Sequence, residues 1–229
     1  MENLLIVTIL LHVKEGKMMS SEFIMKRAQN YFWERTLVEV VKRPVRFLVN
    51  TPITPNMVTV TNMILNTGIC CYLAINNKYV LTALFIQIYM LCDVLDGNLA
   101  RNKKMCSSLG KRLDQISDFL FFTVFFLVLG WNMDIPFWWA ICAVLMQNIY
   151  GLIATFYIAP FIRKSENFKR TKLKQYFYDR GILFGMDVTL QCLVSSIFLL
   201  TPYRKYLFLV YMGLWLIDLI YRLYEIKQQ

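Results

Sequence analysis

Six stretches of this sequence are apolar over the length that crosses a lipid bilayer, about 20 residues of α-helix. Hydrophobic residues make up 57% of the 229 residues, charged residues make up only 17%, and the mean hydropathy is +0.45. We expect transmembrane helices at about residues 57–76, 79–100, 112–131, 136–160, 181–201 and 204–222. The predicted fold is therefore an all-α, polytopic membrane protein with six transmembrane helices.

Basic residues are distributed unevenly between the two sides of this predicted bundle. An even number of spans places both termini on one side, and that side carries 22 of the 25 lysines and arginines. The other side carries only Lys78, Arg204 and Lys205. Because short basic loops stay in the cytoplasm, we expect both termini and the Asp93–Asp118 segment to be cytoplasmic. We also expect the membrane to be a bacterial cell membrane. The net charge of +10 then reflects topology and predicts no nucleic-acid partner.

The segment before the first span has the pattern of a helix at a membrane surface. From about Ser20 to Val49, apolar residues recur at helical spacing with basic residues among them. A basic amphipathic helix lies in the interfacial plane of a bilayer; a helix packed on a partner protein is the alternative. We therefore divide the chain into a cytoplasmic or interfacial region, residues 1–50, and a six-helix transmembrane domain, residues 51–229.

The most informative polar pattern lies where the second and third predicted spans meet the cytoplasm. At spacings of i, i+3, i+4, i+7 and i+8, one helix face carries Asp93, Asp96, Gly97, Ala100 and Arg101. At spacings of i, i+4 and i+8, the next helix carries Gly110, Asp114 and Asp118. Two such helices facing each other would bring four carboxylates together in an apolar setting, which is unstable unless cations neutralise them. This stretch is predicted to be a metal site.

The composition restricts which metal and which chemistry this site supports. The only histidine is His12, outside every span, which excludes a histidine-ligated zinc site and a histidine base, and the six cysteines form no C-x-x-C pair. Carboxylate oxygens select Mg²⁺, Mn²⁺ or Ca²⁺, and four of them can hold two ions about 3.5–4 Å apart that clamp a diphosphate. Gly97 leaves room for a phosphate or nucleoside, and Arg101 adds a planar donor. Asp118, at the rim, is the candidate general base.

A second candidate anion site lies at the start of the first span. Pro55 suits the first turn of a helix, and Asn56 and Thr59 are able to cap it. The free N–H groups of such a turn also suit an anion. A simple helix cap is an equally good interpretation.

The pattern D-x2-D-G-x2-A-R-x8-G-x3-D-x3-D is complete between Asp93 and Asp118 and resembles the signature of the CDP-alcohol phosphatidyltransferases. The six spans, the amphipathic N-terminal segment and the Thr54-Pro55-Asn56 run extend the resemblance over about residues 20–229. It implies an integral membrane enzyme of phospholipid biosynthesis that transfers a substituted phosphate from a CDP-linked alcohol to an acceptor hydroxyl and releases CMP.

The resemblance also implies individual roles, two Mg²⁺ or Mn²⁺ ions and a homodimer. The first metal ion would be bound by Asp93, Asp96 and Asp114. The second would be bound by Asp93, Asp114 and Asp118, with Asp118 also acting as the base. The CDP moiety would contact Asn56, Thr59, Gly97, Ala100, Arg101 and Ser107; only its spacing from Arg101 supports Ser107.

The substrates are less defined than the reaction. CDP-diacylglycerol is the expected donor for so compact a chain, and a choline or ethanolamine phosphotransferase, which usually has more spans, is the alternative. The acceptor is open among glycerol phosphate, inositol or its phosphate, serine and other alcohols. A cation transporter would place acids at several depths, whereas these acids cluster at one face. An inactive homologue is the third alternative.

A basic loop between the fourth and fifth spans also faces the metal side. Topology alone explains its seven basic residues, but the arginines at its ends, Arg163 and Arg180, are candidates to bind an anionic acceptor. We expect Lys169–Lys174 to face solvent. Single acids, Asp187 and Asp218, lie in the last two predicted spans and are candidates for function; for Asp187, pairing with Arg180 or a neighbour is equally plausible.

Overall fold

The computed structural model describes residues 30–165, 170–183 and 185–228, and these are mostly helical. The expected surface helix therefore lies in part, at residues 20–29, outside the described residues. Within these residues, five helical segments are long and apolar enough to cross a membrane: Pro55–Ile75, Tyr79–Asn102, Ser108–Asn132, Phe137–Ile162 and Arg204–Lys227. They correspond to five of the six expected spans, and the chain is a multi-pass membrane protein.

Several of these segments are composed of shorter helices joined without a break. The first contains α3 (Pro55–Thr61), a π-helical turn (Asn62–Asn66) and α4 (Thr67–Ile75). The second is α5 (Tyr79–Asn102), and the third contains α6 (Ser108–Leu120), a π-helical turn (Phe121–Phe125) and α7 (Phe126–Asn132). The fourth contains α8 (Phe137–Ile153), a π-helical turn (Ala154–Ile158) and α9 (Ala159–Lys164). A 3₁₀ turn (Arg204–Tyr206) and α12 (Leu207–Lys227) form the last.

The expected span at residues 181–201 is wrong in its extent. The structure has a short strand, β2 (Ile182–Leu183), paired in parallel with β1 (Asn30–Tyr31), and then α11 (Val188–Leu199). The helix begins there because the Asp187 carboxylate accepts hydrogen bonds from the first free N–H groups, those of Thr189 and Leu190, both at 3.1 Å. Its 12 residues are shorter than a helix that crosses a bilayer unaided.

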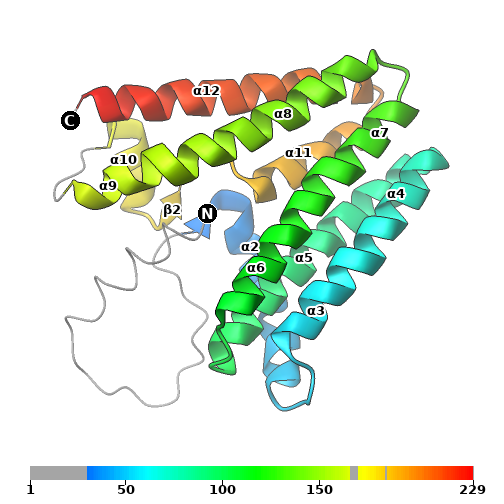
Figure 1. Ribbon diagram of the computed structural model, residues 1–229, viewed down its shortest axis with the longest axis vertical. Coiled ribbons are helices and arrows are strands. Elements are labelled where there is room, and N and C mark those ends of the chain that lie inside the picture. Colours follow the sequence, from blue (N-terminus) through cyan, green and yellow to red (C-terminus); the bar gives the residue numbers. More distant parts are fainter. Residues whose placement is uncertain (1–29, 166–169, 184, 229) are drawn as a thin grey trace.

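The helices pack in two connected groups (Figure 1). α12 lies along α8, whereas α11 and α3 both pack on α5. The helix α2 (Phe32–Val49) also packs on α5, and its buried residues are Leu37, Val38, Val41 and Val45. α10 (Lys172–Tyr178) lies between α9 and β2 in the chain. The helix α5 is therefore the central element of the fold.

A short connection positions the motif. α5 ends at Asn102. In the turn that follows, Lys104 has a positive φ of 56°, and the Met105 N–H donates a hydrogen bond to the Ala100 carbonyl oxygen at 2.9 Å. The Ser107 hydroxyl then accepts a hydrogen bond from the Gly110 N–H at 3.0 Å and begins α6. Only residues 103–107 separate the two helices, and carboxylates from both halves of the motif converge near this connection.

Candidate metal centre and active site

Three of the four motif aspartates converge between α5 and α6. One carboxylate oxygen from each of Asp93, Asp96 and Asp114 lies within 4.8 Å of the others. Asp96 is buried, and Asp93 and Asp114 are partly exposed. In the part of the chain that the structure describes, no other such group of three ligands occurs. Converging carboxylate oxygens suit a hard divalent cation, so these residues fit the metal that the motif predicts.

Asp96 receives a hydrogen bond from the first span. The Thr59 hydroxyl of α3 donates to Asp96 Oδ2 at 2.5 Å, and the Pro55 carbonyl oxygen lies 3.2 Å from the same hydroxyl. Thr59 is therefore in contact with a metal-ligand candidate, a role that its sequence position did not predict. The N-cap of α3 is Thr54, which accepts from the Met57 N–H at 3.3 Å, so the expectation that Asn56 or Thr59 caps this helix is wrong.

Asp118 lies outside the group of three, one turn further along α6. Its Oδ1 accepts a hydrogen bond from the Tyr89 hydroxyl at 3.4 Å, and that hydroxyl lies 3.0 Å from Ser117 Oγ. The structure thus gives Asp118 an environment different from that of the other acids. Sequence reasoning missed Tyr89, although it lies four residues before Asp93 on the same helix face and could have been found from that spacing.

The small motif residues allow two close approaches. A Cβ built on Gly97 would lie 3.6 Å from Arg101 Nη1, so the guanidinium lies against this glycine. A Cβ built on Gly110 would lie 2.9 Å from Asn56 Oδ1 and 3.2 Å from Ser107 Oγ. Asn56 and Ser107, both expected to contact a CDP group, are therefore close together at the start of α6, where Ser107 acts as the helix cap.

Lys103 connects the end of α5 to the chain before α3. Its ammonium group donates to the carbonyl oxygens of Thr51 at 2.6 Å and Ile53 at 2.7 Å. These contacts hold the segment that leads into Asn56. The sequence provided no signal for them, because the acceptors are backbone atoms about fifty residues away.

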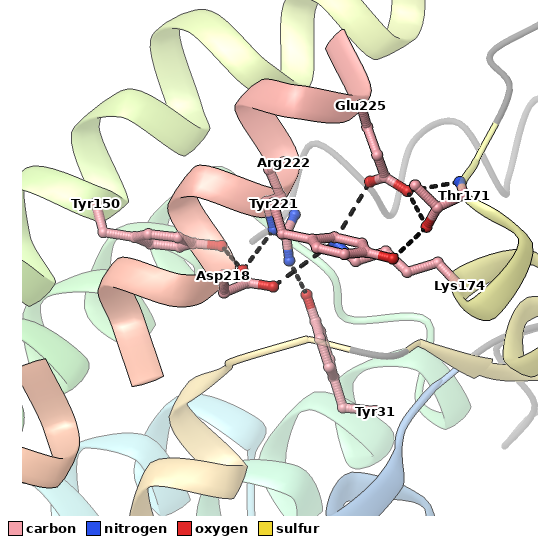
Figure 2. Close-up of polar contacts among 8 residues, drawn as sticks. All are labelled: Tyr31, Tyr150, Thr171, Lys174, Asp218, Tyr221, Arg222 and Glu225. Carbon is pink, nitrogen blue, oxygen red and sulfur yellow. Dashed lines mark hydrogen bonds and ion pairs between the residues drawn. The ribbon is translucent and has the colours of Figure 1, made fainter. Parts of the chain in front are cut away.

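A second buried polar cluster lies where α12 meets α8, α10 and β1 (Figure 2). Asp218 accepts hydrogen bonds from the Tyr150 hydroxyl at 2.5 Å and from Arg222 Nε at 2.7 Å. The Lys174 ammonium lies 3.7 Å from Asp218 Oδ1 and 3.3 Å from Glu225 Oε2. The acid predicted in the last span is therefore neutralised by two cations, and the cluster joins α12 to α8 and α10.

The same cluster reaches the N-terminal strand and the start of α10. Arg222 Nη2 donates to the Tyr31 hydroxyl at 3.1 Å, and Glu225 Oε1 accepts from the Thr171 N–H at 2.9 Å. Lys174 is only 5% exposed, so the expectation that it faces solvent is wrong. Burial lowers the pKa of its ammonium group, while Asp218 and Glu225 favour the charged form.

Of the two predicted acceptor arginines, Arg180 makes contacts outside this cluster. Arg180 is exposed; its guanidinium lies 3.5 Å from the centre of the Tyr176 ring and donates to the Tyr176 carbonyl oxygen at 3.0 Å. Arg163 belongs to α9, but its side chain lies outside the described residues. Asp187 does not pair with Arg180, because its carboxylate caps α11.

Comparison with known proteins identifies the class to which this fold and motif belong. The family model of the CDP-alcohol phosphatidyltransferases matches residues 52–218. The chain belongs to that family, whose members are membrane transferases of phospholipid synthesis. A comparison with curated proteins found no match.

Solved structures with a similar fold include phosphatidylinositol phosphate synthase (PgsA1) of Mycobacterium tuberculosis. Its apo form matches with a TM-score of 0.54 and 17% identity over 81% of this chain and 94% of the synthase chain. The form with CDP-DAG bound matches with a TM-score of 0.55 and 17% identity over 82% and 92%. The form with manganese and citrate matches with a TM-score of 0.55 and 18% identity over 81% and 88%. At these identities the likeness establishes a common fold.

Proposed function

We propose that this protein transfers the phosphatidyl group of CDP-diacylglycerol to the hydroxyl of an acceptor alcohol and releases CMP. The observation that carries the proposal is the convergence of three motif carboxylates between α5 and α6, with Asp118 one turn away. The CDP-DAG bound to the similar Mycobacterium tuberculosis synthase supports the same donor here.

The carboxylates provide the ligands for two divalent cations, Mg²⁺ or Mn²⁺. Asp93, Asp96 and Asp114 would hold the first, and Asp93, Asp114 and Asp118 the second. When bound, such ions neutralise the diphosphate and stabilise its leaving oxygen. The manganese in one structure of the similar synthase supports this choice of metal. The Thr59 hydroxyl would hold Asp96 in place through its hydrogen bond.

The remaining motif residues would bind the donor and move one proton. We assign the CDP moiety to Asn56, Thr59, Gly97, Ala100, Arg101 and Ser107; the closeness of Asn56 and Ser107 supports this set. The acceptor oxygen attacks the phosphorus of the phosphatidyl group, and the bond from that phosphorus to the CMP oxygen breaks. Asp118 takes the proton of the acceptor hydroxyl.

The acceptor side and the assembly are also proposals. We assign an anionic acceptor to Arg163 and Arg180, at the ends of the basic loop. The exposed guanidinium of Arg180 supports this role, because an exposed cation remains accessible to a ligand. We further propose that the protein is a homodimer. The metal site and both termini would lie in the cytoplasm, as the distribution of basic residues predicts.

A direct assay tests the reaction. Purified protein in detergent would be incubated with CDP-diacylglycerol, Mg²⁺ or Mn²⁺ and a panel of alcohols, and CMP would be measured. We expect release that depends on one acceptor, is abolished by EDTA and is restored by Mn²⁺ or Mg²⁺ but poorly by Zn²⁺. Full activity in EDTA would contradict the metal assignment. Release of CMP only from CDP-choline or CDP-ethanolamine with a lipid alcohol would place the protein in the other branch of the family.

A further inference from the structure

Tyr89 is a buried side chain held rigidly beside the motif. It lies in α5 one turn before Asp93, and its relative exposure is 0%. Its ring stacks on that of Phe121, with a distance of 3.6 Å between ring centres and an angle of 7° between planes. Because Phe121 follows α6 directly, this stacking fixes the phenol relative to the helix that carries Asp114 and Asp118.

The Tyr89 hydroxyl has two polar neighbours on α6, which define the direction of its hydrogen bonds. Asp118 Oδ1 lies 3.4 Å away and Ser117 Oγ lies 3.0 Å away. An ionised carboxylate only accepts, so the single phenolic proton is donated to Asp118, and the Ser117 hydroxyl donates to the phenolic oxygen. With Oδ1 engaged in this way, Oδ2 is the oxygen left to accept a proton.

We propose that Tyr89 is a positioning residue that fixes the rotation of the Asp118 carboxylate for proton transfer. Asp118 is not one of the three acids whose oxygens lie within 4.8 Å of one another, and its Oδ1 accepts a hydrogen bond from Tyr89 instead. The buried phenol, stacked on Phe121, restrains this carboxylate, since it keeps one carboxylate oxygen occupied before substrate arrives. This inference rests on the proposed function, in which Asp118 is the base.

The substitution Tyr89→Phe tests the proposal because it retains the stacked ring and removes only the hydroxyl. A hydrogen bond to a charged group contributes enough that its loss should lower kcat for CMP release by about 10-fold. The KM for CDP-diacylglycerol and the Mn²⁺ affinity of the purified protein, measured by electron paramagnetic resonance, should stay within about twofold of wild type. Ser117→Ala, which removes the donor to the phenol, should give a smaller fall in kcat.

Tyr211→Phe is a matched control within the same chain. Tyr211 is also buried, and its hydroxyl hydrogen-bonds to Ser195 Oγ and to the Gln191 carbonyl oxygen, but to no carboxylate. Its kcat should remain near that of wild type. An equal loss in both variants would mean that only packing is disturbed and would overturn the proposal.

Three further outcomes also overturn it, and they are distinguishable. Wild-type kcat in Tyr89→Phe would show that the phenol has no positioning role, while the proposed function would stand. A loss of Mn²⁺ affinity parallel to the loss of kcat would assign Tyr89 to metal binding instead. No CMP release by the wild-type protein with any acceptor would remove the proposed function, and this inference with it.

Discussion

At the residue scale, the four motif aspartates occupy two different environments, although they share one sequence pattern. Asp93, Asp96 and Asp114 have oxygens within 4.8 Å of one another, and such repelling charges are stable together only when a cation neutralises them. Asp118 is hydrogen-bonded to a phenol instead. This division predicts that the acids will differ in what their substitution removes.

The first prediction separates ligand from base. Asp93→Asn and Asp114→Asn should weaken Mn²⁺ binding and lower turnover together, because each is expected to contact both ions. Asp118→Asn should lower kcat for CMP release by about 100-fold or more while the donor KM changes little. Steady-state kinetics together with Mn²⁺ titration checks both parts. Near-normal turnover in Asp118→Asn would remove it from the base role.

The second prediction concerns the acceptor. If Arg163 and Arg180 bind an anionic acceptor, then Arg163→Gln and Arg180→Gln should each raise the acceptor KM by about 10-fold or more, with little change in the donor KM. Lys172→Gln is a control in the same loop, because Lys172 is exposed and has no assigned role. Wild-type acceptor KM in both arginine variants, with normal membrane insertion, would leave these residues a role in topology alone.

At the scale of elements, the buried cluster around Asp218 joins α10 and β1 to α12. Lys174 comes from α10, Glu225 and Arg222 from α12, and Tyr31 from β1, and their contacts fasten three segments that are distant in sequence (Figure 2). A buried charge that loses its partner is strongly destabilising, whereas removal of both charges of a pair is often neutral. The cluster should therefore behave as one unit in stability measurements.

The third prediction follows from the difference between removing one charge of a buried pair and removing both. Glu225→Gln keeps the shape of the side chain but leaves the Lys174 ammonium without its closer carboxylate, so the protein should lose about 3 kcal/mol of stability. The double variant Glu225→Gln with Lys174→Met should recover most of that loss. Thermal unfolding in detergent measures both. An equal or larger loss in the double variant would show that the ion pair does not explain the effect.

At the scale of the whole molecule, the five apolar helices establish a multi-pass membrane protein, and the basic residues predict its orientation. Cys106 provides a natural probe of that orientation, because it is exposed in the connection between α5 and α6, beside the metal site. The loop at the opposite end of α5, residues 76–78, contains no cysteine, so a control cysteine has to be introduced there.

The fourth prediction is therefore that a membrane-impermeant maleimide will not modify Cys106 in intact cells and will modify it after permeabilisation. The control is Lys78→Cys in a Cys106→Ser background, which should be modified in intact cells. Mass spectrometry of the labelled peptides distinguishes these sites from Cys142, which lies within a predicted membrane span. Modification of Cys106 in intact cells would contradict the proposed orientation.

Features that depend on spacing along one element could be predicted without the structure. Five spans follow from the length of apolar runs, and Asp93 and Asp96 share a helix face because three residues separate them. The family followed from fixed gaps within 26 residues, and its model matches residues 52–218. In each case a local period of the chain is sufficient, so no knowledge of helix packing is needed.

Contacts between side chains of different elements could not be predicted in this way, because they depend on how the helices pack. Tyr89 reaches Asp118 and Thr59 reaches Asp96 because the rotation of each helix about its axis is set by packing, which no local period encodes. Lys174, predicted to face solvent, is buried because Asp218 and Glu225, about fifty residues away, neutralise its charge. The fifth span was predicted too long for a local reason instead: the Asp187 carboxylate accepts hydrogen bonds from the N–H groups of Thr189 and Leu190, so α11 begins only at Val188.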